Sequence, residues 1–383
     1  MDLNEFSDIA PFNDEEASAA LARLSNHPNV PWISKYIFPD KPETLLRDIL
    51  RNIHSVDEFQ DMVMVYAVEW VITNTVRNFS YDGISRVSDT GKKYLFMSNH
   101  RDIILDPAFM QLILHRNNLP YTQIAVGDNL LKQKSVELLI RANRMIKVIR
   151  GISARELYLS SQLLSKYIRE TITSGQSSVW IAQRQGRTKD GMDQTEQGLL
   201  KMLDMSGTGD FVENFKELNL IPLSVSYEYE PCDYLKAREL LISRTQKYVK
   251  GELEDLQSIM QGIRAPKGNV HINIGDPLTE EEIREASLYD KNDRYQYIRH
   301  AIDRRIIKGY KLWKTNYMAY DLRYGTGKYA AHYTEDELDA FKTYVVKQLM
   351  QIEPPLNPVD LQEIFLGIYS NPVLAKEQLE EKA

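Results

Sequence analysis

The feature that most constrains the fold is an alternation of two kinds of sequence between residues 92 and 276. Short runs rich in β-branched and aromatic residues recur there, separated by longer stretches with apolar residues at helical spacing. The short runs are YLFMS, TQIAV, MIKVI, SVWIA, LIPLSVSYEY and VHINIG, which begin at residues 94, 122, 145, 178, 220 and 270. Strands that alternate with helices predict an α/β fold, in which a mixed, mostly parallel sheet is flanked by helices.

The sequences on either side of this region predict helices. Residues 1–85 carry apolar residues at helical spacing up to a turn signal at Tyr81-Asp82-Gly83, and helical patterns return after about residue 280. We therefore predict three parts: a helical accessory region (1–85), an α/β domain (86–280) and a helical C-terminal extension (281–383). With 383 residues, of which 43% are hydrophobic, the chain can bury a sizeable core.

Cysteine content and the N-terminal sequence bear on location. Cys232 is the single cysteine, which excludes an internal disulfide and fits a reducing compartment. The N-terminal sequence MDLNEFSDIAPFNDEE is acidic and lacks the apolar run of a signal peptide, and no apolar window has the length needed to span a bilayer. We expect a cytoplasmic protein, with peripheral contact at the inner face of a membrane as the alternative.

The net charge of -7 is unevenly distributed. Between residues 132 and 150 the single acid Glu137 stands among six basic residues, which are Lys132, Lys134, Arg141, Arg144, Lys147 and Arg150. This basic band predicts an anionic partner, such as lipid headgroups or an acidic carrier protein, or else an ordinary solvated helix face. Nucleic acid fits poorly, because the chain is acidic overall and has no nucleic-acid motif.

Reactive residue types gather just after the predicted strands, where α/β sheets place their chemistry. Asn99 and His100 follow the strand YLFMS, and Asp102 and Asp106 come next. A histidine at such a place suits a general base, and a nearby carboxylate would orient its ring. The alternative is that Asn99 and Asp106 cap the following helix and that His100 is an ordinary surface residue.

Basic residues follow two other predicted strands. Gly186, Arg187 and Lys189 come after SVWIA, and Arg150 with Gly151 ends the strand MIKVI. A glycine beside basic residues ahead of a helix suits an anion such as a phosphate. In the same loop, Asp193 and Glu196 have the spacing of a capping box for the next helix.

Two alternatives are excluded by spacing. The triplet HRD at residues 100–102 resembles a kinase catalytic loop, but Pro107 stands where that loop needs asparagine. The histidines are scattered without metal-ligand spacing, so we predict no metal site and no cofactor.

Four blocks of the sequence resemble the glycerolipid acyltransferases, the superfamily that acylates glycerol 3-phosphate and lysophosphatidic acid. NHRDIILDPA resembles the block of Asn-His, four residues and Asp, and SVWIAQRQGRTKDG resembles the block with a strand and a Gly-Arg element, in the form found in the soluble plastid glycerol-3-phosphate acyltransferase. MIKVIRG resembles the block that ends in arginine, and LIPLSVSYEYEP the late block with proline at a strand start. The blocks occur in family order between about residues 90 and 275.

Two positions depart from the family pattern. Five residues rather than four separate His100 from Asp106, so the expected aspartate position holds Leu105. A one-residue insertion before the helix accommodates this difference, and Asp102 is the alternative partner of the histidine. In the second departure, Gln183-Arg184-Gln185 stand where many members carry Glu-Gly.

The resemblance implies acyl transfer in phospholipid synthesis, from acyl-CoA or acyl carrier protein as co-substrate to glycerol 3-phosphate, with lysophosphatidic acid as the alternative acceptor. It implies that His100 is the base and Asp106 its partner. The remaining roles are phosphate binding by Arg187, Lys189 and Arg150, and support of the site by Asn99, Gly186 and Pro222. A non-catalytic lipid-binding protein on the same fold is the alternative of another class.

Overall fold

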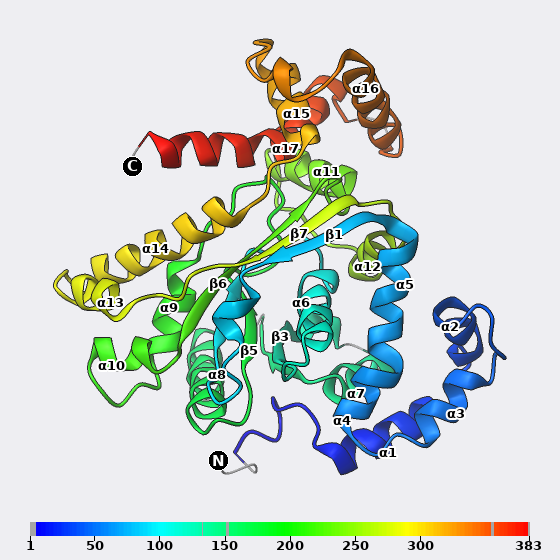
Figure 1. The fold of residues 1–383 in the computed structure, drawn as a ribbon, viewed down its shortest axis with the longest axis vertical. Coiled ribbons are helices and arrows are strands. Elements are labelled where there is room, and N and C mark those ends of the chain that lie inside the picture. The colour runs from blue at the N-terminus through cyan, green and yellow to red at the C-terminus, as the bar shows by residue number, and fades with distance from the viewer. Residues whose placement is uncertain (1–4, 132, 151–152, 354–355, 382–383) are drawn as a thin grey trace.

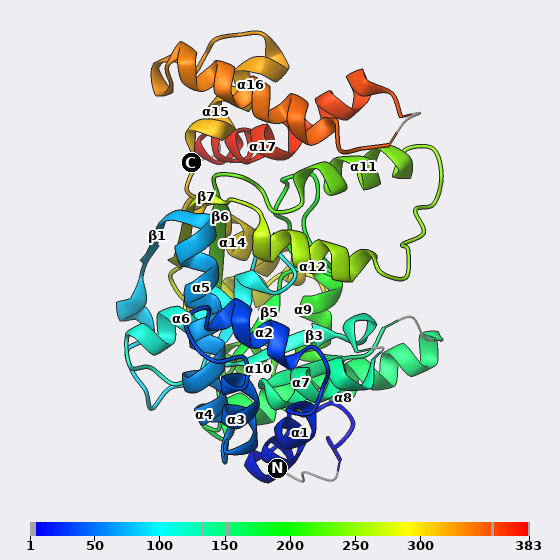
Figure 2. The same cartoon turned by 90° about the vertical axis from the view of Figure 1, so that its right-hand side faces the viewer.

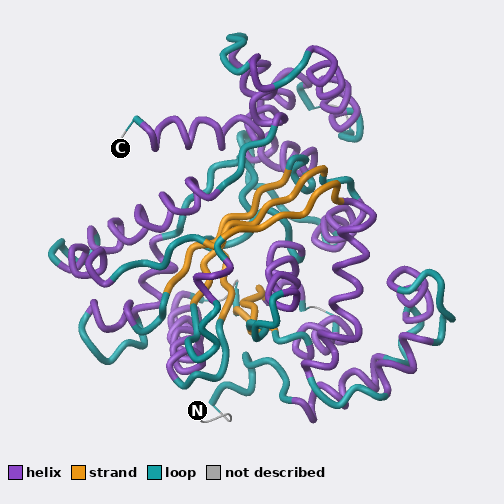
Figure 3. The backbone as a smooth tube through the Cα atoms, in the orientation of Figure 1, coloured by secondary structure: helices purple, strands orange, loops and turns teal. Residues whose placement is uncertain are grey.

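A seven-stranded sheet forms the centre of the computed structural model, which describes residues 5–131, 133–150, 153–353 and 356–381 (Figures 1 and 3). The strands are β1 (Val76–Asp82), β2 (Leu95–Ser98), β3 (Gln123–Gly127), β4 (Met145–Val148), β5 (Val179–Ala182), β6 (Leu220–Tyr227) and β7 (Gly268–Ile274). Their order across the sheet is β1-β7-β6-β2-β5-β3-β4. The β6–β7 pair is antiparallel and the other pairs are parallel, which confirms the predicted mixed, mostly parallel α/β sheet.

Helices occupy both faces of the sheet and both flanks. The N-terminal helices are α1 (Asp14–Leu24), α2 (Val30–Ile37), α3 (Leu45–Arg51), α4 (Val56–Phe59) and α5 (Val65–Thr75), with a π-helical stretch at Gln60–Met64. The helices between strands are α6 (Leu105–Arg116), α7 (Lys134–Ala142), α8 (Ala154–Thr173), α9 (Gln197–Asp204), α10 (Phe211–Lys216), α11 (Asp233–Ser243) and α12 (Glu254–Arg264). The C-terminal helices are α13 (Glu280–Ser287), α14 (Asp293–Gly309), α15 (Lys314–Tyr324), α16 (Glu335–Leu349) and α17 (Pro358–Glu380), and short 3₁₀ turns lie at Ile84–Val87, Asp128–Leu130 and Ala330–His332.

Each of the six predicted strand runs forms a strand, but the prediction of helix up to residue 85 is wrong at its end. Residues Val76–Asp82 form β1, which pairs in parallel with β7. The helical pattern stops at Thr75, and Val76, Phe79 and Tyr81 pack into the core beside β7. The sheet therefore begins at Val76, inside the range predicted to be helical.

Alternation along the strands separates two cores. In β2, Leu95 and Met97 face a core built with α8, α9 and α14, while Phe96 faces the core that contains Met110 and Leu114 of α6. A strand buried on both faces needs apolar residues in succession, and all eight residues of β6 are buried.

The flanking helices form further apolar clusters. Helices α1 to α4 pack around Leu21, Leu50 and Phe59, and α11, α15, α16 and α17 pack around Phe341 and Phe365. In Figures 1 and 2 the C-terminal cluster stands above one end of the sheet. No helix within the described ranges is both long and apolar enough to cross a bilayer.

Candidate active site

The turn after β2 is fixed to the neighbouring strands before any site chemistry begins. Asn99 is fully buried, its side-chain amide donates to the Val225 carbonyl (3.1 Å), and its side-chain oxygen accepts from the Val225 N–H (2.7 Å). These bonds extend the pairing of β2 with β6 beyond the last β2 residue. Asn99 thus anchors the turn that presents His100.

His100 and Asp106 form a directed hydrogen-bonded pair. The imidazole Nδ1 lies 2.9 Å from Oδ2 of Asp106, which also accepts the backbone N–H groups of Arg101 (2.6 Å) and Asp102 (3.0 Å). The other carboxylate oxygen, Oδ1, accepts the hydroxyl of Tyr227 (2.7 Å). Because a carboxylate accepts hydrogen bonds, Nδ1 carries the proton, and Nε2 is left as the basic nitrogen.

Asp102, the alternative partner, does not bond to the imidazole. Its Oδ1 accepts the backbone N–H groups of Ile104 (3.0 Å) and Leu105 (2.9 Å), so it closes the turn before α6. Its Oδ2 is buried without a hydrogen-bond partner, close to Gly262 of α12. Burial, followed by the neighbouring charge of Asp106, raises the pKa of Asp102.

His100 lines a cavity of about 110 Å³ at the carboxyl ends of β2, β3 and β5. The ring meets Trp180 edge to face, with 5.8 Å between ring centroids. The three residues predicted to bind a phosphate, Arg150, Arg187 and Lys189, also line this cavity, and so does Gly186, which was predicted to support the site. Three loops far apart in sequence therefore meet where the topology of a parallel sheet predicts.

The basic groups of the cavity differ in how freely they can meet an anion. Lys189 is ion-paired with Glu239 of α11, and the Arg187 guanidinium donates one hydrogen bond, to the Ser258 hydroxyl (3.3 Å). A second nitrogen of Arg187, Nη1, is buried with no partner. Burial lowers the pKa of Arg150, while the carboxylates of Asp128, Glu196 and Asp255 act in the opposite direction.

The loop 183–196 is attached to the histidine turn through its backbone. The Thr188 N–H donates to the His100 carbonyl (2.7 Å), and the Gln183 N–H donates to the Ser98 carbonyl (2.8 Å). Gly191 of this loop has a left-handed φ of 80°, and a Cβ there would lie 2.2 Å from the Ile368 carbonyl oxygen of α17. The loop 183–196 is thus held between the histidine turn and the C-terminal helix.

Asp193 does not cap α9, as its spacing with Glu196 predicted. Its carboxylate accepts hydrogen bonds from Asn99 (3.0 Å), Arg101 (2.6 Å) and Thr188 (3.0 Å), and the N-cap residue of α9 is Glu196, without a side-chain cap. The prediction failed because three buried donors around the histidine turn take up this carboxylate.

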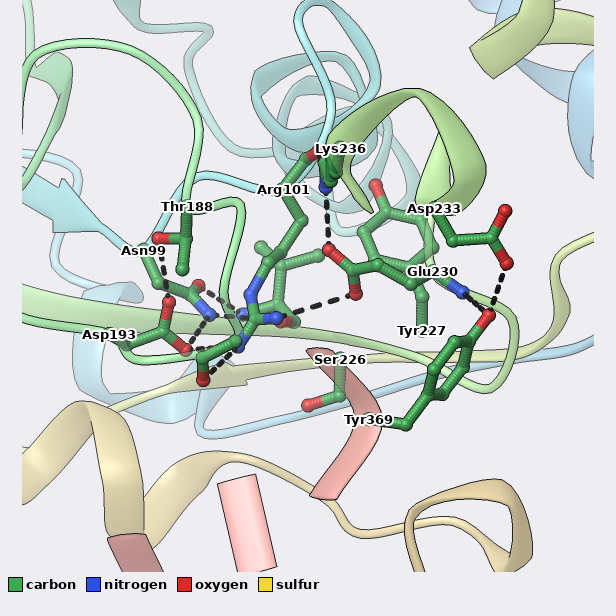
Figure 4. Close-up of polar contacts among 12 residues, drawn as sticks. Asn99, Arg101, Thr188, Asp193, Ser226, Tyr227, Glu230, Asp233, Lys236 and Tyr369 are labelled. Carbon is green, nitrogen blue, oxygen red and sulfur yellow. Dashed lines mark hydrogen bonds and ion pairs between the residues drawn. The ribbon is translucent and has the colours of Figure 1, made fainter. Parts of the chain in front are cut away.

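A buried ion network beneath the turn was missed in the sequence (Figure 4). Arg101 is fully buried, pairs with Asp193 and Glu230, and lies over the Tyr310 ring at 5.0 Å from its centroid. Lys236 joins the Arg101 carbonyl (2.8 Å) to Glu230 (2.6 Å). The position of Arg101 directly after His100 was the available signal, but its partners lie more than 90 positions away in sequence.

Some residues that the sequence analysis singled out lie outside the cavity and contact other parts of the protein. Pro222 lies within β6, opposite Met97, and is not among the residues lining the cavity. In the basic band, Arg141 donates to the carbonyls of Ser7 and Ala10, and Arg144 is ion-paired with Asp57. The side chains of these two arginines are therefore engaged within the chain, where they bind the N-terminal region. Lys132 and Gly151 lie outside the described residues.

Within the described ranges, no three His, Cys, Asp or Glu side chains gather in a way that could hold a metal ion. A larger hollow of about 810 Å³ lies between α11, the start of α12 and residues 351–353, and its lining includes Tyr248, Leu253 and Ile352. This hollow contains neither His100 nor Arg187.

An imidazole held by a carboxylate beside arginine and lysine is a site for deprotonating a hydroxyl group next to an anion. Residues 78–218 match the family model of the acyltransferases. These residues therefore form an acyltransferase domain, in agreement with the resemblance of the sequence motifs. The matched segment contains His100, Asp106 and Arg187 but ends before Tyr227 and the C-terminal helices.

Among solved structures, the chain is similar to the 1-acyl-sn-glycerophosphate (LPA) acyltransferase PlsC from Thermotoga maritima, with 11% identity and a TM-score of 0.38, over 77% of this chain and 95% of that chain. A score this low does not establish shared geometry. A search of curated proteins found no match.

Proposed function

We propose that this acyltransferase moves a fatty acyl group from a thioester donor, acyl-CoA or acyl carrier protein, to a hydroxyl of glycerol 3-phosphate. The observation that carries the proposal is one cavity shared by His100, which Asp106 orients, and by Arg187 with its unpartnered guanidinium nitrogen. A base beside an anion-binding group is what an acceptor with both a hydroxyl and a phosphate requires.

The proposed reaction needs no acyl-enzyme. Nε2 of His100 takes the proton of the acceptor hydroxyl, and the oxygen attacks the thioester carbonyl. The tetrahedral intermediate collapses, the C–S bond breaks, and the imidazolium returns the proton to the thiolate. Asp106 stabilises the imidazolium and keeps the proton of Nδ1 in place, as the buried aspartate does in Ser-His-Asp triads.

Phosphate binding is assigned to the arginine side of the cavity. The guanidinium of Arg187 offers a planar pair of donors, which matches two phosphate oxygens better than an ammonium does. Lys189 is tied to Glu239, so we assign it a secondary role, together with Arg150. The cavity of about 110 Å³ is small beside the roughly 300–1,000 Å³ of drug-sized ligand sites, which favours a compact acceptor headgroup.

The reaction is tested by following thiol release from acyl-CoA with glycerol 3-phosphate and, separately, with lysophosphatidic acid. We expect turnover with glycerol 3-phosphate and a loss of about 10³-fold or more in kcat for His100→Ala. Faster turnover with lysophosphatidic acid would reassign the acceptor. Absence of turnover with every phosphorylated glycerol would favour a lipid-binding protein on this fold instead.

The phosphate assignment has a separate test. Arg187→Ala should raise the KM for glycerol 3-phosphate at least tenfold and leave the KM for acyl-CoA nearly unchanged, because it removes a contact to the acceptor alone. Arg116→Ala is the matched control, since Arg116 pairs with Glu69 and does not line the cavity. Equal acceptor KM values in the two variants would refute the assignment.

A further inference from the structure

The first helical turns of α8 expose apolar side chains that nothing in the described structure covers. Leu157, Tyr158 and Leu159 are 47%, 55% and 53% exposed. Successive residues of a helix point about 100° apart, so three in a row present apolar surface around most of its circumference. These side chains are exposed because the N-terminal part of α8 projects beyond the sheet, as Figure 2 shows at the right of the view.

A second exposed apolar group lies on the segment that joins α11 to α12 and on the first turn of α12. Val249, Leu253 and Leu256 are 80%, 56% and 51% exposed. In Figure 2 this segment projects on the same side of the molecule as the α8 end. Scattered exposed apolar residues are ordinary on protein surfaces, but two groups that project in one direction indicate a partner.

The acyltransferase cavity lies between these two groups. Arg150, which lines the cavity, stands a few residues before α8, and Lys250 and Asp255, which also line it, belong to the second segment. The side-chain amide of Asn129 donates to Asp255 (2.9 Å) and connects the two walls. The side of the cavity bounded by these residues therefore faces the direction in which both apolar groups project.

The charges between the two groups favour an anionic surface. Five basic side chains there make no ion pair with another described residue; they are Arg150, Arg155, Arg184, Arg187 and Lys247. Most of the nearby carboxylates are occupied: Glu156 caps α8, Glu254 accepts from Tyr248, and Asp255 pairs with Lys250. Glu252 and Glu196 are exposed exceptions, and Glu196 and Asp128 both act on Arg150.

We propose that this face docks on an anionic phospholipid bilayer, with Leu157, Tyr158, Leu159, Val249, Leu253 and Leu256 entering the interfacial layer. Apolar side chains supply the burial, Tyr158 suits the boundary between headgroups and acyl chains, and unpaired arginines attract anionic headgroups. Docking itself is argued from these surface residues alone. Its consequence rests on the proposed function: the cavity would open toward the lipid, and an acylated product would pass into it.

Binding is tested by flotation of the full chain with vesicles of phosphatidylglycerol and phosphatidylcholine, compared with vesicles of phosphatidylcholine alone. We expect binding to the anionic vesicles, weakened at high salt, and at least a tenfold loss of affinity in the triple variant Leu157→Ser, Tyr158→Ser, Leu159→Ser. A second triple variant, Val249→Ser, Leu253→Ser, Leu256→Ser, should show the same loss. The control is Leu288→Ser with Val359→Ser, which removes two residues that are 84% and 74% exposed elsewhere.

Three results would overturn the proposal: no binding of the intact chain to anionic vesicles, binding by both triple variants that is as tight as that of the intact chain, or a dimer in sedimentation velocity that the α8 variant dissociates. The last result would assign the face to a second copy of the chain. Vesicle binding by His100→Ala and thiol release without vesicles by the α8 variant separate this proposal from the proposed function, because each readout can fail alone.

Discussion

The carboxylate of Asp106 accepts hydrogen bonds from two directions. One oxygen receives the His100 ring and the N–H groups of Arg101 and Asp102, and the other receives the Tyr227 hydroxyl from β6. The histidine turn therefore wraps around its own partner, while the sheet fixes that partner from behind. Such a surrounding holds the ring in one tautomer and orientation.

Replacing this carboxylate by an amide should abolish most of the activity. In Asp106→Asn the amide oxygen can still accept from Nδ1 and from the two backbone N–H groups, but the negative charge that stabilises the imidazolium is lost, and we expect a loss of about 10²- to 10⁴-fold in kcat. Asp102→Asn keeps the oxygen that accepts from Ile104 and Leu105, and it should stay within about tenfold of the intact enzyme. Steady-state kinetics of both variants would contradict us if Asp102→Asn were the more damaging.

Removal of the Tyr227 hydroxyl should have a smaller effect on the same carboxylate. Tyr227→Phe keeps the buried ring, and we expect a loss of roughly tenfold in kcat, about 1.4 kcal/mol, with the acceptor KM unchanged. Tyr167→Phe is the control, because that buried hydroxyl donates to Gln123, outside the lining of the cavity. Equal kcat values for the two variants would remove Tyr227 from the site.

Site residues could be predicted where they belong to a short local sequence pattern. His100 and Asp106 stand in one short motif, and Arg187 follows a strand directly. Lys236, Glu230 and Tyr227 were missed because each meets the histidine turn from a segment more than 100 positions further along the chain. Asp193 was misread for the same reason: its spacing from Glu196 is local, whereas its partners are not.

At the scale of elements, strands between two helices were predictable and the edge strand was not. β2 and β5 are short apolar runs with helical patterns on both sides. β1 continues directly from α5 without a turn residue, and its sequence VRNFSYD mixes polar with aromatic residues, so nothing in it interrupts the helical reading. It becomes a strand because β7, about 190 positions further along the chain, provides its hydrogen bonds.

The junction of α11 with the C-terminal helices makes stability depend on pH. Asp233 at the start of α11 accepts the hydroxyls of Tyr344 (2.6 Å) and Tyr369 (2.6 Å), and burial raises its pKa from 3.8 to about 6. Between these values the folded chain binds a proton that the unfolded chain has released. The free energy of unfolding therefore falls as the pH rises from about 4 to 6.

The contribution of Asp233 can be isolated by comparison with Asp233→Asn. The shift from 3.8 to about 6 corresponds to roughly 3 kcal/mol, so the stability of the intact protein relative to the variant should decline by about that amount between pH 4 and pH 6.5. Urea denaturation across this range measures the difference. A constant difference would mean that Asp233 titrates alike in the folded and unfolded chains.

At the scale of the whole molecule, α17 contacts the site although it lies outside the segment that matches the family. Asn371 donates to the Asp190 carbonyl (2.7 Å), the Tyr369 hydroxyl accepts the Glu230 N–H (3.0 Å), and the Ile368 carbonyl lies against Gly191. The helix thus contacts both the loop 183–196 and the ion network under the histidine turn. Its role could not be predicted, since Glu230 and Asp190, which it contacts, lie 139 and 181 positions away in sequence.

A methyl group at the contact between loop and helix should disturb stability and binding together. Gly191→Ala adds a clash with α17 to the cost of a left-handed residue, whereas Gly175→Ala has a similar φ of 74° and open space around it. We expect Gly191→Ala to lose at least about 2 kcal/mol more stability than Gly175→Ala, and to raise the acceptor KM because Arg187 shares the loop. Equal losses in thermal and chemical unfolding would show that α17 does not press on the loop.

This arrangement also sets when the enzyme becomes active during its synthesis. A nascent chain that has emerged as far as residue 218 contains the entire stretch that matches the acyltransferase family, with His100, Asp106 and Arg187 already made. It still lacks Tyr227, Glu230 and α17, which hold the histidine turn and the loop in place. We therefore expect the partly made chain to show no turnover of thioesters. Activity should begin only when the C-terminal helices have left the ribosome and packed against the α/β domain.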